Sequence, residues 1–329
     1  NLNEQSWEVN NSFEKSELLQ KQIAFGFSSE DFDYIINSMA ANAKEPTYCM
    51  GDDIPLAILS NKSHILYDYF KQRFAQVTNP PIDPLREKLV TSLEMHLGIR
   101  KAPLIPQEES ARLIHIKSPI INEKELIEVK KLGLNYKEIS TLIPFENDIN
   151  SLEKGLKGLC EKAEKSVING AEILILSDRN IDREKTYIPP LLAVGSVHHH
   201  LLRKGLRLKT SIVIDTAQCW STHHIACLVG YGASAICPWL MLETTRHWWQ
   251  LPKTQKLISD GKLSNLSIET AQENVKTSLE DGLRKILSKI GISVLASYHG
   301  AQIFEAIGIG ADLIDLAFRG TTSRIAGLT

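Results

Sequence analysis

The spacing of apolar residues changes along the chain near residue 137. Before this point, one apolar stripe predicts a helix over about 28–39 and a second predicts a helix over about 63–77. Ser28 suits the start of the first helix, because its hydroxyl can accept a hydrogen bond from a free backbone N–H group. The stretch 78–84 holds three prolines, which predict a stiff, extended loop. The region 99–136, divided by further prolines, is interpreted as a connection.

After residue 137, short apolar runs alternate with amphipathic helices. Such alternation is typical of βα units, in which right-handed crossovers join parallel strands. The strand candidates are nearly continuous Ile, Val and Leu, as expected for a sheet buried on both faces. The sequence therefore predicts an α/β fold, with a helical N-terminal part followed by a parallel sheet. A barrel, a partial barrel and an open doubly wound sheet all satisfy the pattern. The predicted strands are 139–143, 171–177, 211–215, 233–237 and 292–295, and the predicted helices are 151–169, 189–204, 221–231 and 268–290.

Composition and charge exclude several classes of protein. The 329 residues are enough for one large or two ordinary domains, and a formal charge of -2 gives no attraction to nucleic acid or an anionic membrane. No apolar run approaches the roughly 20 residues that span a bilayer. Five widely spread cysteines favour a reducing compartment. The chain lacks an initial methionine and stops abruptly at 326–329, so we expect it to be a piece of a longer protein.

The stretch 230–235 has the G-x-G-x-x-A form of a dinucleotide-binding loop. That loop works when a strand precedes it and a helix follows, so that the helix N-terminus meets the pyrophosphate. Here the predicted helix comes first and the predicted strand second. We therefore interpret 230–235 as a helix-to-strand turn.

A group of histidines and cysteines raises the possibility of a metal site. Cys219, His223 and Cys227 are spaced four residues apart, and three consecutive histidines precede them at 198–200. Zinc binds such nitrogen and sulfur ligands. Consecutive helical residues, however, point about 100° apart and cannot all converge on one ion. Packing and hydrogen bonding between helix and sheet is the preferred interpretation of these histidines.

Three further groups have both a functional and a structural interpretation. Cys219 could be a nucleophile with His223 as its base, although no oxyanion element is evident nearby. The pair Trp248-Trp249 could stack ligands, but packing at a helix end fits the near-neutral charge better. The pair Asp52-Asp53 could act in acid–base chemistry, or one carboxylate could cap a short helical run that follows it.

Several long blocks closely resemble the central region of glutamate synthases. Two further blocks, 217–224 and 244–249, are similar to the ferredoxin-dependent branch of cyanobacteria and algal plastids. The resemblance covers nearly the whole chain and is weakest over 1–25 and 99–150. Its main blocks are 48–57, 66–84, 192–203, 230–235, 297–310 and 320–325.

The resemblance implies a connecting role. In that family, an amidotransferase domain releases ammonia from glutamine, and a (β/α)8 domain carrying FMN and a 3Fe-4S cluster uses it to convert 2-oxoglutarate to glutamate. By resemblance, Met50, Thr78 and Asn79 line the ammonia tunnel between the two. No family position for a catalytic cysteine, cluster ligand or flavin contact is matched, so we expect no cofactor in this segment. A tunnel needs walls that do not collapse, which suits the stiff loop at 78–84.

Two hypotheses follow. In the first, one central domain comprises a helical and loop part at 1–136, a βα-repeat part at 137–320 and the start of a junction to the FMN domain at 321–329. Its partners are the amidotransferase and FMN domains of the same chain, and ferredoxin is a partner of the parent enzyme. The expected location is the plastid stroma or the cyanobacterial cytoplasm. No nucleic acid or membrane partner is expected. In the second hypothesis, the chain is a self-contained α/β zinc enzyme that uses the histidines and cysteines named above.

Overall fold

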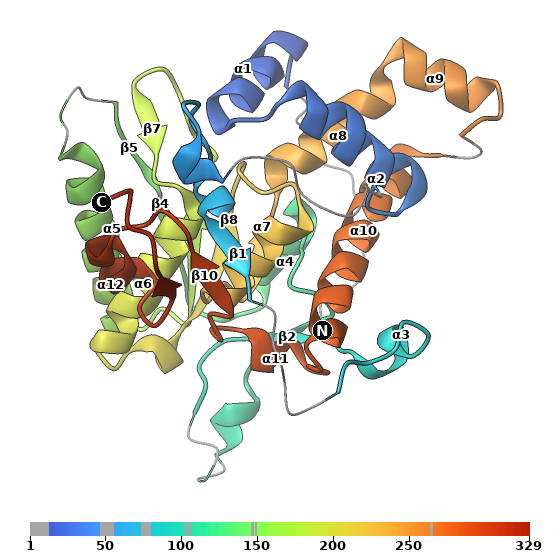
Figure 1. Cartoon of the computed structure of the whole chain (residues 1–329). Coiled ribbons are helices and arrows are strands. Elements are labelled where there is room, and N and C mark those ends of the chain that lie inside the picture. Colours follow the sequence, from blue (N-terminus) through green and yellow to red (C-terminus); the bar gives the residue numbers. More distant parts are fainter. Residues whose placement is uncertain are drawn as a thin grey trace.

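The computed structural model describes residues 13–46, 56–73, 80–101, 104, 107–145, 148, 150–263 and 266–329. These residues form an α/β structure in which one parallel sheet is flanked by helices and a helical group packs beside its upper end (Figure 1). Within the described part of the chain, no helix is both long and apolar enough to cross a lipid bilayer. The proposed division at residues 136 and 320 stays a prediction.

The main sheet has four parallel strands that neighbour one another in chain order, β4, β6, β8 and β9. An order without reversal is that of a barrel wall rather than of a doubly wound sheet. A parallel bridge between Ile120 and Ile236 continues the sheet beyond β9. Of the predicted arrangements, the order of the described strands favours a barrel or partial barrel over a doubly wound sheet. The strands are β4 (Tyr136–Ser140), β6 (Ile173–Ser177), β8 (Ser211–Asp215) and β9 (Ala235–Cys237).

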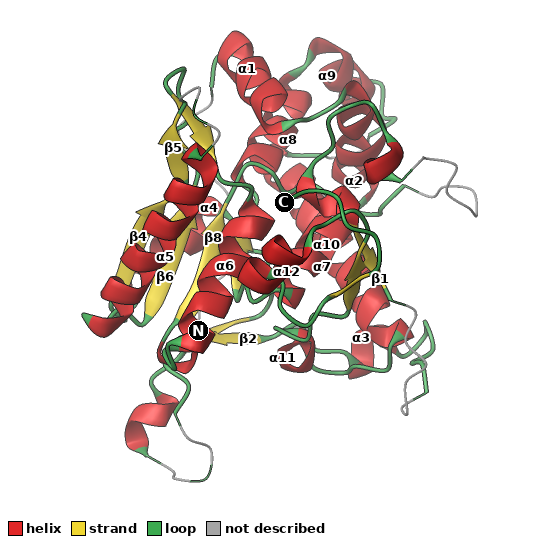
Figure 2. Ribbon diagram, turned by 60° about the vertical axis from the view of Figure 1, so that its left-hand side comes forward, coloured by secondary structure: helices red, strands yellow, loops and turns green. Residues whose placement is uncertain are grey.

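Burial along the strands explains their composition. Every residue of β6 and β8 is buried, in agreement with the apolar runs that predicted them. In the edge strand β4, only Ile139 is buried, and the other positions are polar or carry a hydroxyl. The crossover helices cover one face of this sheet (Figure 2). They are α5 (Ser151–Ile168), α6 (Pro190–Arg203) and α7 (Thr222–Gly230).

A helical group packs around the long helix α10 (Ile268–Lys289), which contacts α2, α7 and α8. Ser28 starts the first of the predicted helices, since its hydroxyl accepts from the Asp31 N–H at 3.1 Å. The group includes α1 (Lys15–Phe25), a π-helical turn (Asp31–Ile36), α2 (Asn37–Asn42), α8 (Trp239–Gln250) and α9 (Pro252–Ser259). The remaining helices are α3 (Glu87–Val90), α4 (Glu123–Lys131), α11 (Leu295–Tyr298) and α12 (Ala311–Ala317).

Among the described residues, three smaller sheets accompany the main sheet. One of them joins distant segments in the order β1-β10-β11, and the others pair β2 with β3 and β5 with β7. Their strands are β1 (Phe70–Gln72), β10 (Phe304–Ala306), β11 (Thr322–Ser323), β2 (Met95–Leu97), β3 (Ile114–Ile116), β5 (Leu142–Pro144) and β7 (Lys185–Tyr187).

Three predicted elements are wrong in the described residues. The helix expected at 63–77 is a 3-10 turn (Leu66–Tyr69) followed by strand β1, because the backbone of β1 pairs with β10. The strand expected at 292–295 is reduced to one bridge between Ser92 and Val294, after which α11 begins. The strand expected at 139–143 is two strands, β4 and β5, which belong to different sheets. At 63–77, pairing with a strand far along the chain overrides the local helical pattern. The other two predictions fail because only one bridge forms at Val294 and because the 139–143 run divides between two sheets.

Candidate functional site

We call the three strands β1, β10 and β11 the loop-anchoring sheet. β1 runs antiparallel to β10, with Phe70 opposite Ala306, and β10 runs parallel to β11. The Phe70 ring is buried against Tyr231 and Phe318, with ring centroids 5.4 and 4.8 Å away. These edge-to-face contacts fix β1 on the turn after α7 and on the segment that leads to β11.

The tunnel residues implied by the resemblance, Met50, Thr78 and Asn79, lie outside the described residues, as do Asp52 and Asp53. The described residues on either side of the second loop are held firmly. On one side, the Arg73 N–H donates to the Ile303 carbonyl at 3.1 Å, which extends the pairing of β1 with β10. On the other side, the Ile82 N–H donates to the Ser288 carbonyl at 2.9 Å, at the end of α10.

The segment after the first loop reaches the same sheet. It begins with a 3-10 turn (Ala57–Leu59), and the Ile58 side chain packs where β10 ends. A Cβ placed on Gly308 would lie only 2.6 Å from the Ile58 Cβ, so only glycine fits there. Gly308 also donates to the Ile325 carbonyl at 2.8 Å. β10 and the residues on either side of it, Ile303 and Gly308, thus contact the borders of both loops and the residues that follow β11.

The three consecutive histidines point in three directions. His198 accepts a hydrogen bond from Nε of Arg207 at 2.9 Å, while His200 contacts Glu164 at 2.7 Å. Nδ1 of His199 lies 3.0 Å from the Gly195 carbonyl oxygen, and its Nε2 lies 2.9 Å from the Gln302 amide nitrogen and 3.3 Å from the Arg319 carbonyl oxygen. Burial, together with Arg207, lowers the pKa of His198 to about 2. All three histidines have structural partners.

The zinc hypothesis is not supported. Among the described residues, no three histidine, cysteine or acidic side chains are grouped so that they could hold a metal ion. The predicted pair of Cys219 and His223 is also not formed within that part of the chain, because His223 lies 3.6 Å from the sulfur of Cys227 and 3.0 Å from the Tyr67 carbonyl. Burial raises the pKa of the Cys219 thiol, which opposes a nucleophilic role.

Two structural interpretations are confirmed. The stretch 230–235 is a helix-to-strand turn between α7 and β9, in which Gly232 has a φ of 115°. A Cβ on Gly232 would overlap the His198 ring. The tryptophan pair packs at the end of α8: Trp248 is buried, and the Trp249 indole donates to the Leu266 carbonyl at 2.8 Å.

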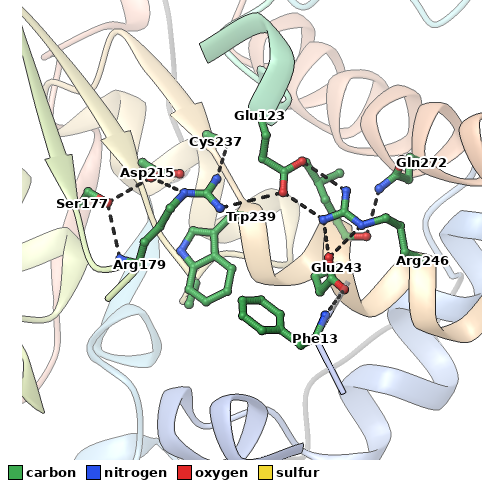
Figure 3. A network of polar contacts seen from close by, with 12 residues as sticks. Phe13, Glu123, Ser177, Arg179, Asp215, Cys237, Trp239, Glu243, Arg246 and Gln272 are labelled. Atoms are coloured by element: carbon green, nitrogen blue, oxygen red, sulfur yellow. Dashed lines mark hydrogen bonds and ion pairs between the residues drawn. The ribbon is translucent and has the colours of Figure 1, made fainter. Parts of the chain in front are cut away.

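A second polar network, which the sequence analysis missed, lies at the carboxyl ends of the parallel strands (Figure 3). Arg179, just after β6, donates from Nε to Asp215 at the end of β8 at 2.6 Å. Arg246 on α8 bonds two carboxylates, Glu123 at 3.0 and 3.3 Å and Glu243 at 2.7 Å. The helix that carries Glu123 begins with a complete capping box at Asn122 and Glu125, a sequence signal that could have predicted α4.

Asp178 is the buried carboxyl beside this network. It accepts hydrogen bonds from the Thr216 hydroxyl at 2.6 Å, the Trp239 indole at 2.8 Å and the Ala217 N–H at 3.0 Å. Burial nevertheless dominates and raises the pKa of Asp178 to about 7. The guanidinium of Arg179 lies 5.3 Å from the Trp239 ring, so the same indole contacts both groups.

Comparison with known proteins identifies the chain. Residues 20–310 match the family model of the glutamate synthase central domain, and the chain belongs to that family. It is 60% identical over 316 residues to ferredoxin-dependent glutamate synthase 2 of Synechocystis sp., covering 95% of this chain and 20% of that protein. It is 57% identical over 314 residues to ferredoxin-dependent glutamate synthase of Pyropia yezoensis, with the same coverage. The chloroplastic enzyme of Spinacia oleracea is 54% identical over 323 residues, covering 96% of this chain and 20% of that protein.

The chain therefore spans about a fifth of the length of the curated relatives it matches. Among solved structures, it is similar to a double mutant of flavocytochrome b2 with pyruvate bound, at a TM-score of 0.45 and 10% identity over 89% of this chain and 92% of that one. This score is too low to define a shared fold.

Proposed function

We propose that the chain is the central connecting segment of a ferredoxin-dependent glutamate synthase, which makes L-glutamate from glutamine and 2-oxoglutarate. The support is the identity of 51–60% to enzymes of that name in cyanobacteria, red algae and plants. In this proposal the segment carries no catalytic group of its own. It connects the amidotransferase domain to the FMN domain, and the junction to the latter begins at 321–329.

The proposed tunnel role of Met50, Thr78 and Asn79 gains support from the loop-anchoring sheet. β1, which borders the second loop, pairs with β10, and Ile58, which borders the first loop, packs on Gly308 just beyond β10. β10 is also paired with β11 at the start of the proposed junction. Walls attached to one strand keep their mutual position, which a passage for a small molecule requires. This shared attachment is the observation that carries the proposal.

FMN and the 3Fe-4S cluster belong, in this proposal, to other parts of the parent enzyme. Cys160, Cys219, Cys227 and Cys237 are buried and free, and within the described residues they form no cluster of ligands. Ferredoxin is the proposed electron donor of the parent enzyme. The chloroplastic and cyanobacterial relatives favour the plastid stroma or the cyanobacterial cytoplasm as its location.

The test is a Thr78→Trp substitution in the full-length enzyme, with glutamine hydrolysis and 2-oxoglutarate consumption followed together. We expect hydrolysis to continue while glutamate formation falls and free ammonia accumulates, because the indole would block the passage. Thr270→Trp, at an exposed position near the start of α10, is the control for the added indole. Equal and unchanged rates in Thr78→Trp would show that the segment is a spacer.

A further inference from the structure

A pocket of about 610 Å³ opens at the carboxyl ends of the parallel strands, beside the network of Figure 3. Arg179 and Trp239 lie just after β6 and β9, Glu123 starts α4, and Phe13 with α1 forms the opposite wall. We call it the strand-end pocket. Folds built from parallel βα units bind their ligands at this end of the strands, because the loops there converge. The proposed tunnel role leaves this pocket without a function.

Two of the three acidic residues of the lining, Glu123 and Glu243, have strong partners. Arg246 binds both Glu123 and Glu243, and the second oxygen of Glu243 accepts from the Phe13 N–H at 3.1 Å. Lys130, a cation of the lining, bonds Glu138 at 2.7 Å. Glu123, Glu243 and Lys130 are therefore neutralised by these partners, which leaves Glu17 as the acidic residue of the lining that is half exposed.

Two cations of the lining keep donors for a ligand. Arg179 uses Nε for Asp215, but its terminal nitrogens make only long contacts, 3.9 Å to Glu123 and 3.7 Å to the sulfur of Cys237. Its side chain is 33% exposed. Lys21, on the α1 wall, is 12% exposed and lies 3.5 Å from Glu17, which is itself half exposed. Because the pair is long and Glu17 is half exposed, this ion pair is weak, and the Lys21 ammonium also lies 4.9 Å from the centroid of the Phe13 ring.

The rest of the lining is largely apolar. Phe13, Leu126, Ile181 and Trp239 contribute to it, and the Phe13 and Trp239 ring centroids are 6.0 Å apart. An apolar interior with cations on two walls matches a short carbon chain that has an acidic group at each end. The terminal nitrogens of an arginine bind a carboxylate in a two-pronged geometry, whereas lysine acts as a point charge.

We propose that the strand-end pocket binds a small dicarboxylic acid, with Arg179 holding one carboxylate and Lys21 the other. The acidic pair Glu123 and Glu243 is already occupied by Arg246 and does not compete with the ligand for Arg179. The ligand would contact α1, α4 and the ends of β6 and β9 at once. Binding would therefore order the wall that α1 provides.

The test uses the full-length protein with succinate as the probe, by isothermal titration and by crystal structures with millimolar succinate. Lys21→Met should lose the succinate site or weaken it at least tenfold, since one charge-assisted contact is removed. Lys15→Met, which removes an exposed cation from the same helix, is the matched control and should bind as wild type. Because loss of Arg179 would leave Asp215 buried without its partner, Arg179→Lys is the second variant, and it should weaken binding while keeping the fold.

Succinate density between Arg179 and Lys21 in the wild-type crystal structure would support the proposal, provided that the density is lost in Lys21→Met and kept in Lys15→Met. Three results would overturn it. The first is unchanged binding in Lys21→Met. The second is displacement of succinate by inorganic phosphate at equal concentration, which would make the pocket a general anion site. The third is a crystal structure in which another part of the full-length chain fills the pocket.

Discussion

Tyr231 and Thr321 share a hydrogen bond of 2.7 Å between their hydroxyl oxygens, and both residues are buried. Tyr231 follows α7, whereas Thr321 precedes β11, so this bond ties the main βα repeat to the start of the proposed junction. The Tyr231 ring also stacks on Phe304 of β10, with centroids 5.8 Å apart. One side chain thus contacts two strands of the loop-anchoring sheet.

Tyr231→Phe should lower the free energy of unfolding by about 1–2 kcal/mol, because it leaves the buried Thr321 hydroxyl without its partner. Tyr298→Phe is a matched control. The Tyr298 hydroxyl is buried and has no hydrogen-bond partner among the described residues, so its removal should be neutral or stabilising. Urea unfolding of both variants tests the difference. Equal losses would mean that the Tyr231 hydrogen bond contributes nothing specific.

Gly232→Ala should destabilise the protein by about 3 kcal/mol or more, because it combines an unfavourable φ of 115° with an overlap on the His198 ring. Gly133→Ala separates these two causes. Gly133 has a φ of 82°, but nothing lies within 4 Å of its added Cβ, so about 1 kcal/mol of backbone strain is expected. Denaturant midpoints measure both. Similar midpoints for the two variants would contradict the steric argument.

The stability of the protein should depend on Asp178 in a defined pH range. Because burial raises the pKa of Asp178 from its ordinary value of 3.8 to about 7, the folded protein holds a proton that the unfolded chain releases. The contribution of Asp178 to stability is therefore complete below about pH 4 and is lost as the pH rises through 7. Asp178→Asn has no titrating carboxyl at this position, so its stability should not fall over this pH range for this reason.

The measurement is the difference in unfolding free energy between Asp178→Asn and wild type at pH 4, 6 and 8. From pH 4 to pH 8, the unfolding free energy of Asp178→Asn should rise relative to that of wild type by a few kcal/mol, because each unit of pKa shift corresponds to about 1.4 kcal/mol. Taking the difference cancels the opposite trend of buried His198 and His224, whose pKa values burial lowers. Asp182→Asn, at an exposed position, should show no such gain. A constant difference for Asp178→Asn would refute the assignment.

Glu123→Gln should cost about 3–5 kcal/mol, because it leaves Arg246 buried with one charged partner fewer. Glu138→Gln breaks an ion pair of similar length with Lys130, but Glu138 is 45% exposed, so the loss should stay below about 1 kcal/mol. Thermal unfolding compares the two. A small loss for Glu123→Gln would show that the charged network is dispensable for folding.

Local pattern was sufficient for the βα repeat. The helix expected at 151–169 ends within one residue of α5, and the strand at 211–215 matches β8, because both have a strong apolar period and neighbours close in the chain. The local pattern gives the wrong element at 63–77. Phe70 has the spacing of a helical residue but lies in a strand that pairs with β10, and β10 is too far along the chain to influence a local sequence pattern.

The network at the strand ends was missed for a related reason. Arg246 lies two residues before Trp248, but its partner Glu123 lies on α4, within the region 99–136 that the pattern marks only as a connection. Nothing in the spacing of Arg179 and Asp215 marks them as a pair. Ion pairs between separate βα units become visible only when the strands are placed side by side.

The pairing of β1 with β10 also bears on how the chain folds. Phe70 meets Ala306 more than two hundred residues later, whereas β6, β8 and β9 pair with strands that are near neighbours in sequence. Contacts so far apart carry a large entropic cost of loop closure and form late. During synthesis, the main sheet can assemble first, whereas β1 can pair only after residues 304–306 have left the ribosome. The borders of both loops would then become ordered last, after the main sheet has formed.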